Sequence, residues 1–113
     1  MAEYLELPSG QQVYLQEFVY GQRGPWGLTM RYRFVAPEIG AGGSVDFAAA
    51  SSDMQYLCDT YALPRIPAIG PQPNQIIISM SDRELDFGAA APDAVQYFEA
   101  YNIVDGACVW EPF

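Results

Sequence analysis

The sequence contains no histidine and no lysine, and its 113 residues carry five basic groups against 14 acidic ones. Without histidine, the chain has no imidazole base and forms neither a Ser-His-Asp triad nor a Cys-His pair. Without lysine, it lacks a Schiff-base amine and the lysine of a phosphate-binding loop. These absences exclude the commonest catalytic centres and favour a protein that is not an enzyme.

Basic residues are scarce, and all five are arginines: Arg23, Arg31, Arg33, Arg65 and Arg83. The formal net charge is −9, whereas proteins bind nucleic acid mainly through cations. We therefore expect no direct binding to nucleic acid. The acidic groups are spread along the chain, which is typical of a solvated surface. The alternative is an acidic face that attracts a basic partner protein.

Long apolar runs are also missing, since no stretch approaches the roughly 18 residues that a membrane-spanning helix needs. No basic segment followed by an apolar one stands near Met1, so no signal peptide is predicted. We expect a soluble protein that does not enter a membrane, cytoplasmic if the chain is complete and periplasmic if a leader has been removed.

The length of the chain and its 50% apolar content predict a single domain over residues 1–113. The sequence leaves the oligomeric state open.

Alternating apolar residues predict strands over residues 12–20 and 28–35, paired as a hairpin, after a short strand over residues 3–7. Both faces of the 12–20 strand carry apolar residues, so we expect it to be central or covered on both sides. The β-branched run Ile76-Ile77-Ile78 predicts a buried strand over Gln75–Ser81.

One helix is predicted with Ser44 as its N-cap, Asp46 in its first turn and Pro64 as its end. Apolar residues recur along it at the spacing of a core-facing helix: Phe47, Ala50, Met54, Leu57, Cys58 and Tyr61. The four prolines of residues 64–74 predict a stiff connection. Residues 93–101 fit either a helix or a strand, and the Asp105-Gly106 turn favours a hairpin from Tyr97 onward. Together the patterns predict an α+β fold, a mostly antiparallel sheet of five or six strands with one helix packed on a face.

The two cysteines, Cys58 and Cys108, allow a disulfide that would close a loop of about 50 residues. Two buried, reduced thiols are the alternative, and the sequence does not decide between them. With no histidine, two cysteines supply too few ligands for a structural zinc site. We predict no metal and no cofactor.

A short strand is predicted over residues 84–87, after a turn at Asp82-Arg83. Three carboxylates alternate in Asp82, Glu84 and Asp86, and on a strand they would share one face. Such a group suits a hard cation or an acid–base pair, but a solvated edge is the favoured interpretation. Arg31 and Arg33 share the polar face of the 28–35 strand. There we expect internal salt bridges rather than an anion site.

The eight tyrosines, six phenylalanines and two tryptophans exceed what a core of this size buries. Exposed aromatic residues are typical of protein interfaces. The predicted interface residues are Trp26, at the tip of the first hairpin, and the acidic residues Asp82, Glu84, Asp86, Asp105 and Glu111.

Several short motifs resemble a known family: residues 7–11 (LPSGQ), 86–88 (DFG), 96–101 (QYFEAY) and 106–111 (GACVWE). The chain resembles a family of small, uncharacterised alphaproteobacterial proteins known only as a domain of unknown function. Members of that family often carry an export leader, so the resemblance implies a Cys58–Cys108 disulfide. It implies no activity, and no catalytic residue is carried over.

We therefore expect a small, acidic, non-enzymatic binding or inhibitory protein that contacts a basic surface of its partner. A specific version is a phage-type inhibitor, such as an anti-CRISPR protein. The alternatives are an exported periplasmic protein held by its disulfide, and a small enzyme that uses carboxylates alone.

Overall fold

A computed structural model describes residues 3–24, 27–70, 72–87 and 91–112. One six-stranded sheet is formed in chain order: β1 (Leu5–Glu6), β2 (Gln12–Gly24), β3 (Gly27–Val35), β4 (Gln75–Ser81), β5 (Gln96–Val104) and β6 (Ala107–Glu111). Between β3 and β4 lie a short 3₁₀ turn, η1 (Pro37–Ile39), and the helix α1 (Phe47–Leu57). A π-helical turn, η2 (Cys58–Ala62), and a 3₁₀ turn, η3 (Leu63–Arg65), extend α1 to a helical run of 19 residues. The predicted α+β class is confirmed.

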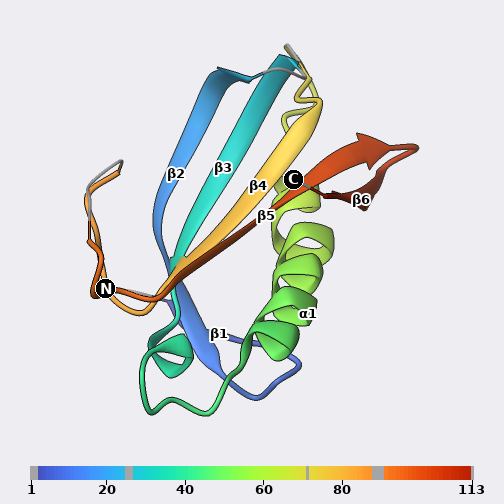
Figure 1. Ribbon diagram of the computed structural model, residues 1–113. Helices are drawn as coiled ribbons and strands as arrows, with labels where there is room; N and C mark the ends of the chain where they lie inside the picture. Colours follow the sequence, from blue (N-terminus) through green and yellow to red (C-terminus); the bar gives the residue numbers. More distant parts are fainter. Residues whose placement is uncertain (1–2, 25–26, 71, 88–90, 113) are drawn as a thin grey trace.

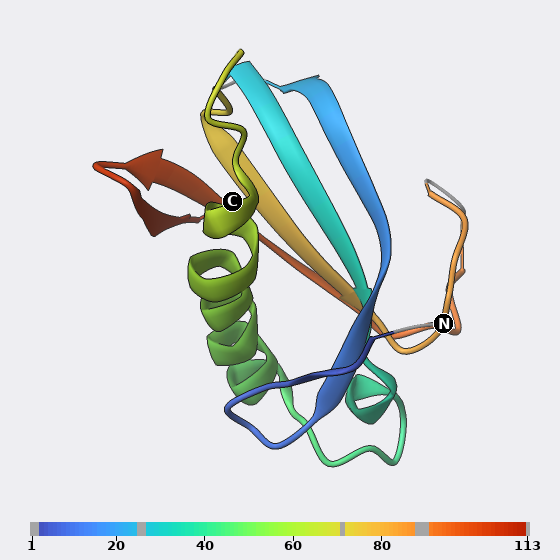
Figure 2. The same cartoon turned by 180° about the vertical axis from the view of Figure 1, so that it is seen from behind.

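The sheet is mostly antiparallel, as predicted, with one parallel pair, β3 and β4. The chain crosses from β3 to β4 through α1, and such a crossover returns the next strand in the same direction. The sheet curls as a half-barrel with α1 on its inner side (Figures 1 and 2). Both β1 and β6, at opposite ends of the sheet, therefore reach the helical run.

The core lies between α1 and the inner face of the sheet. Alternate residues of β3 and β4 point toward α1 and are at most 2% exposed: Met30, Tyr32, Phe34, Ile76, Ile78 and Met80. Ala50, Met54 and Leu57 of α1 meet them. Each large apolar side chain buried in this way stabilises the fold by about 1.5–3 kcal/mol.

Two details of the predicted helix are corrected. The N-cap is Asp46 rather than Ser44, because the Asp46 carboxylate accepts a hydrogen bond from Ala49 N at 2.9 Å. Ser44 instead donates its hydroxyl to Glu38. Pro64 does not end the helical run, since it lies in the first turn of η3, where a missing N–H costs nothing.

Three further predictions concern exposure and strand content. Phe47, expected on the core face of the helix, is 51% exposed and contacts the edge of the Tyr97 ring. The ambiguous segment over residues 93–101 enters strand β5 at Gln96, and the hairpin prediction is confirmed. Its turn uses positive φ at both Asp105 (50°) and Gly106 (76°), as a tight Asp-Gly hairpin requires.

Asp53 of α1 is fully buried and fastens the N-terminal segment to the helix. Its carboxylate accepts hydrogen bonds from Ser9 N at 3.1 Å, from the Ser9 hydroxyl and from Gln11 Nε2 at 2.8 Å. The turn that follows β1 is thereby held against α1, and with it the position of β1. The sequence interpretation missed this residue, although Asp53 stands three residues after Ala50 and four before Leu57, on the apolar face.

Candidate binding surface at the edge of β2

A strip of aromatic side chains crosses from β2 to the helical run. Phe18 and Tyr20 stand two residues apart on the inner face of β2 and are 43% and 44% exposed. Phe18 stacks on Tyr32, its partner in the β2–β3 ladder, with ring centroids 4.7 Å apart. Tyr32 then meets Tyr61 of η2 edge to face at 5.8 Å. We call these four residues the aromatic strip.

The outer edge of β2 beside this strip has no neighbouring strand in the described ladders. β1 pairs only with Gln12 and Val13, and from Tyr14 onward the described part of the sheet pairs β2 with β3 alone. In Figure 1 the upper part of β2 lies at the border of the sheet. The prediction that this strand is central or covered on both sides holds only at its start, where β2 lies between β1 and β3, because β1 is only two residues long.

Two irregularities divide β2. The β2–β3 register shifts between Leu15 and Glu17 and again between Tyr20 and Gln22, as β-bulges do. Residues 17–20 lie between the two shifts and run in regular register with Arg33 to Met30. These four residues form the longest regular stretch of the β2 edge without an outer strand in the described part of the chain.

A cavity of about 310 Å³ adjoins the strip between β1 and the helical run. It is lined by Leu5, Glu6, Leu7, Tyr56, Leu57, Thr60, Tyr61 and Arg65. The Arg65 guanidinium lies 3.6 Å from the centre of the Tyr61 ring and donates to the Tyr61 carbonyl at 2.9 Å. Tyr61 therefore belongs to both the strip and the cavity, and the two adjoin at this residue.

Burial raises the pKa of Tyr32 to about 12, with a smaller opposing effect from Arg65. The Tyr32 hydroxyl is therefore protonated at neutral pH. Charge at the rim comes from Glu6 and Arg65 at the cavity and from Glu17 at the β2 edge. Glu17 is paired with Arg33, which confirms the predicted internal salt bridge.

The predicted carboxylate group of Asp82, Glu84 and Asp86 is not arranged on a strand. Residues 84–87 form no strand, because the Leu85 backbone bonds to side chains instead: Gln16 Nε2 and Arg33 Nη2 each donate to its carbonyl at 2.7 Å. Glu84 accepts from the Tyr14 hydroxyl at 2.7 Å. Asp82 lies 3.6 Å from Arg83 Nε.

The other predicted interface residues lie elsewhere. Asp105 is at the tip of the β5–β6 hairpin, on the opposite side of the molecule from the loop after β4 (Figure 1). Glu111 of β6 accepts a hydrogen bond from Asn102 Nδ2 at 2.6 Å. Trp26 lies outside the described residues. The acidic candidates are therefore spread over two regions, and neither includes the aromatic strip that the sequence interpretation missed.

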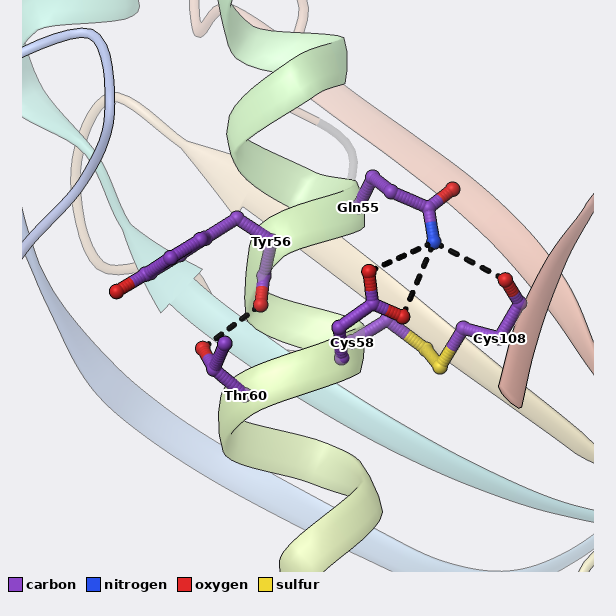
Figure 3. Close-up of a disulfide and its surroundings, with 6 residues drawn as sticks. Gln55, Tyr56, Cys58, Thr60 and Cys108 are labelled. Carbon is purple, nitrogen blue, oxygen red and sulfur yellow. Dashed lines mark hydrogen bonds between the residues drawn. A yellow bond between two sulfur atoms is a disulfide. The ribbon is translucent and has the colours of Figure 1, made fainter. Parts of the chain in front are cut away.

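The two cysteines form a disulfide, which decides the alternative that the sequence left open. The bond joins Cys58, at the end of α1, to Cys108 of β6, and the described residues contain no free cysteine (Figure 3). Beside it, Gln55 Nε2 donates to the Cys108 carbonyl at 3.1 Å and lies 3.3 Å from both carboxylate oxygens of Asp59. The disulfide and Gln55 together fix β6 to the helical run.

Two further classes of site can be assessed from the described residues. No described helix has the length and hydropathy that crossing a membrane requires. In the same part of the chain, no three cysteine or carboxylate side chains lie close enough together to hold a metal ion. The surface that remains is an aromatic one with a free strand edge.

The chain belongs to the family of unknown function DUF6497, which matches residues 1–113. The predicted resemblance to a family of unknown function is thereby confirmed. No curated protein and no solved structure matches the chain.

Proposed function

We propose that this protein is a non-enzymatic binding module that adds an extended segment of a basic partner protein to the free edge of β2. The observation that supports it is the edge stretch of residues 17–20, which has no strand on its outer side in the described sheet. Such an edge offers backbone N–H and C=O groups to an incoming strand. A segment bound there would lie in line with β1, which pairs with the start of the same strand.

The aromatic strip provides the side-chain contacts for this mode of binding. In an antiparallel or parallel pair, alternate side chains of the incoming strand would face Phe18 and Tyr20, and cross-strand pairs with aromatic residues are favourable. Both rings are more than two-fifths exposed in the free protein. The cavity beside Tyr61 offers room for one further apolar side chain.

The charge of the chain selects the kind of partner. At −9, the protein repels a second copy of itself, so self-addition along β2 is disfavoured. Lysine or arginine residues of a partner would instead approach the exposed Glu6 beside the cavity, and Glu17, whose side chain is 45% exposed although it is paired with Arg33. A narrower form of the proposal is an inhibitor that covers a basic nucleic-acid groove, as anti-CRISPR proteins do, and it is supported by the small size and acidity alone.

Two synthetic decapeptides test the proposal, one of alternating valine and lysine and one of alternating valine and glutamate. We expect the lysine peptide alone to bind, with an affinity that falls on addition of salt. In hydrogen exchange, the amides of residues 17–20 that face away from β3 should become protected. Phe18→Lys should weaken the binding about tenfold or more, because it places a cation on the edge.

Phe98→Lys is the matched control, since it makes the same charge change at an exposed aromatic residue on the other face of the sheet. It should leave the affinity nearly unchanged. Equal losses in the two variants would reduce the effect to net charge and contradict the strand-addition proposal. Protection of β6 amides in place of β2 amides would also contradict it.

A second proposal concerns the compartment. We propose that the chain works in an oxidising environment, such as the bacterial periplasm, because structural disulfides persist there and are rare in the cytosol. The Cys58–Cys108 bond supports this proposal. A thiol count on protein isolated from its native host under denaturing, alkylating conditions should find no free thiol. Two alkylated cysteines would refute it.

A further inference from the structure

A second cavity lies between the turn that follows β1 and the connection from η1 to α1 (Figures 1 and 2). Its volume is about 490 Å³, within the range of cavities that hold small organic molecules. It is lined by Tyr4, Ser9, Gly10, Gln11, Gln12, Pro37, Glu38 and Ser44. As far as the structure describes this lining, it shares no residue with the aromatic strip or with residues 17–20, so the cavity is separate from the proposed partner-binding edge.

Gln11 lines this cavity and is only 4% exposed. Its backbone closes the turn, because its N–H donates to Ser9 Oγ at 3.4 Å and its carbonyl accepts from Leu7 N at 2.9 Å. Its side-chain nitrogen, Nε2, donates to the buried Asp53 carboxylate at 2.8 Å. These three hydrogen bonds fix the position of Gln11.

The side-chain oxygen of Gln11, Oε1, is buried and has no hydrogen-bond partner among the described residues. The amide does not gain one by turning over, since Oε1 would then face the Asp53 carboxylate in place of the N–H. A buried acceptor without a partner costs free energy, so contact with a donor would be favourable. This cavity therefore favours a ligand that carries N–H or O–H groups.

The remaining lining selects the kind of donor. Glu38 supplies a carboxylate, and the described lining includes no arginine to neutralise it. Ser44 holds this carboxylate in place, because its hydroxyl and its N–H donate to Glu38 Oε1 at 3.0 and 3.4 Å. Tyr4, which is 59% exposed, and Pro37 add apolar surface. A cation with N–H donors and a short apolar body suits this combination better than an anion does.

We propose that this cavity binds a small organic amine in its ammonium form. The ammonium donates to Gln11 Oε1, the Glu38 carboxylate offsets its charge, and the carbon chain lies against Tyr4 and Pro37. An ammonium has three N–H donors and no acceptor, so it fits a site whose unmet group is an acceptor. Because Oε1 is buried in the free protein, the contact involves a small tilt of the Gln11 amide about its bond to Asp53.

n-Butylamine is the probe, since its amine is protonated at neutral pH as that of lysine is. It has no peptide groups, so it tests this cavity apart from the β2 edge. The full-length, ¹⁵N-labelled protein is titrated at about 150 mM salt, which screens general attraction to the net charge of −9. We expect a dissociation constant on the order of 1 mM, with NMR shifts at the Gln11 side-chain NH₂ and at the amides of Gly10, Gln12 and Glu38.

Two further probes separate the hydrogen bond from the charge. Butyltrimethylammonium has the same charge but no N–H group, and 1-butanol has a hydroxyl donor but no charge. Each should bind about tenfold more weakly than butylamine, because each lacks one half of a charge-assisted hydrogen bond. The Gln11 side-chain NH₂ should shift least with butyltrimethylammonium, which has nothing to donate to Oε1.

Glu38→Gln tests the contribution of the carboxylate. The variant keeps an oxygen for the Ser44 bonds, so the connection should stay folded, and butylamine binding should weaken about threefold or more. Glu111→Gln is the matched control, because it makes the same change in β6, the last strand of the sheet, and should have no effect. Shifts absent at about 10 mM, equal binding of butyltrimethylammonium, or equal losses in the two variants would overturn the proposal.

Discussion

Reducing the Cys58–Cys108 bond is expected to lower the free energy of unfolding by about 4 kcal/mol in the chain-entropy model. The two cysteines are separated by 50 residues, so the bond removes much of the freedom of the unfolded chain. Both cysteine side chains are buried, at 0% and 8% exposure. Once the bond between them is reduced, β6 is held by its ladder with β5 and by the Gln55 hydrogen bond. Urea unfolding of the same protein with and without a phosphine reductant measures the difference.

The double variant Cys58→Ala, Cys108→Ala is the control, since its stability should not respond to the reductant. Hydrogen exchange should show the first loss of protection in β6, because this edge strand depends on the disulfide for its contact with the helical run. An unchanged urea midpoint on reduction would contradict the expected stabilisation. A fall in stability with β6 still protected would contradict the local part of the argument.

The elements that follow from local patterns were predicted well. The alternation of residues 28–35 and the run Ile76-Ile77-Ile78 identify β3 and β4, and the spacing of Ala50, Met54 and Leu57 identifies α1. Strand alternation and helical spacing act over a few residues, so the sequence displays them directly. The parallel pairing of β3 with β4 was not predicted, because it depends on the path of the chain between them.

The candidate surface was harder to predict for the same reason. Apolar residues on both faces of β2 suggested a covered strand, whereas Phe18 and Tyr20 are exposed because β1 ends after two residues. The alternation of Asp82, Glu84 and Asp86 suggested a strand, but side chains of Gln16 and Arg33 bind the Leu85 backbone from distant positions. Pairings across more than 50 residues leave no local pattern.

Replacing Asp53 with alanine is expected to lower the free energy of unfolding by about 3–4 kcal/mol. The variant removes the acceptor for three hydrogen bonds from Ser9 and Gln11, and it leaves the buried Gln11 amide without its partner. Hydrogen bonds to charged groups contribute roughly 1.5–3 kcal/mol each, and those to one carboxylate are not additive. Urea unfolding of the variant and of the parent protein measures the loss.

Ser9→Ala provides the comparison, because it removes the hydroxyl bond but keeps the Ser9 N–H and Gln11 contacts. Its loss should be about 1 kcal/mol, and the double variant should lose less than the sum, since both changes affect one network. A loss below about 1 kcal/mol for Asp53→Ala would contradict the role of this carboxylate.

The Asp53→Ala variant should also release the turn after β1 and open the wall formed by Leu5 and Leu7, so it couples the buried carboxylate to the cavity beside Tyr61. Asp53→Ala should therefore also weaken binding of the valine–lysine peptide, whereas reduction of the distant disulfide should affect that binding less.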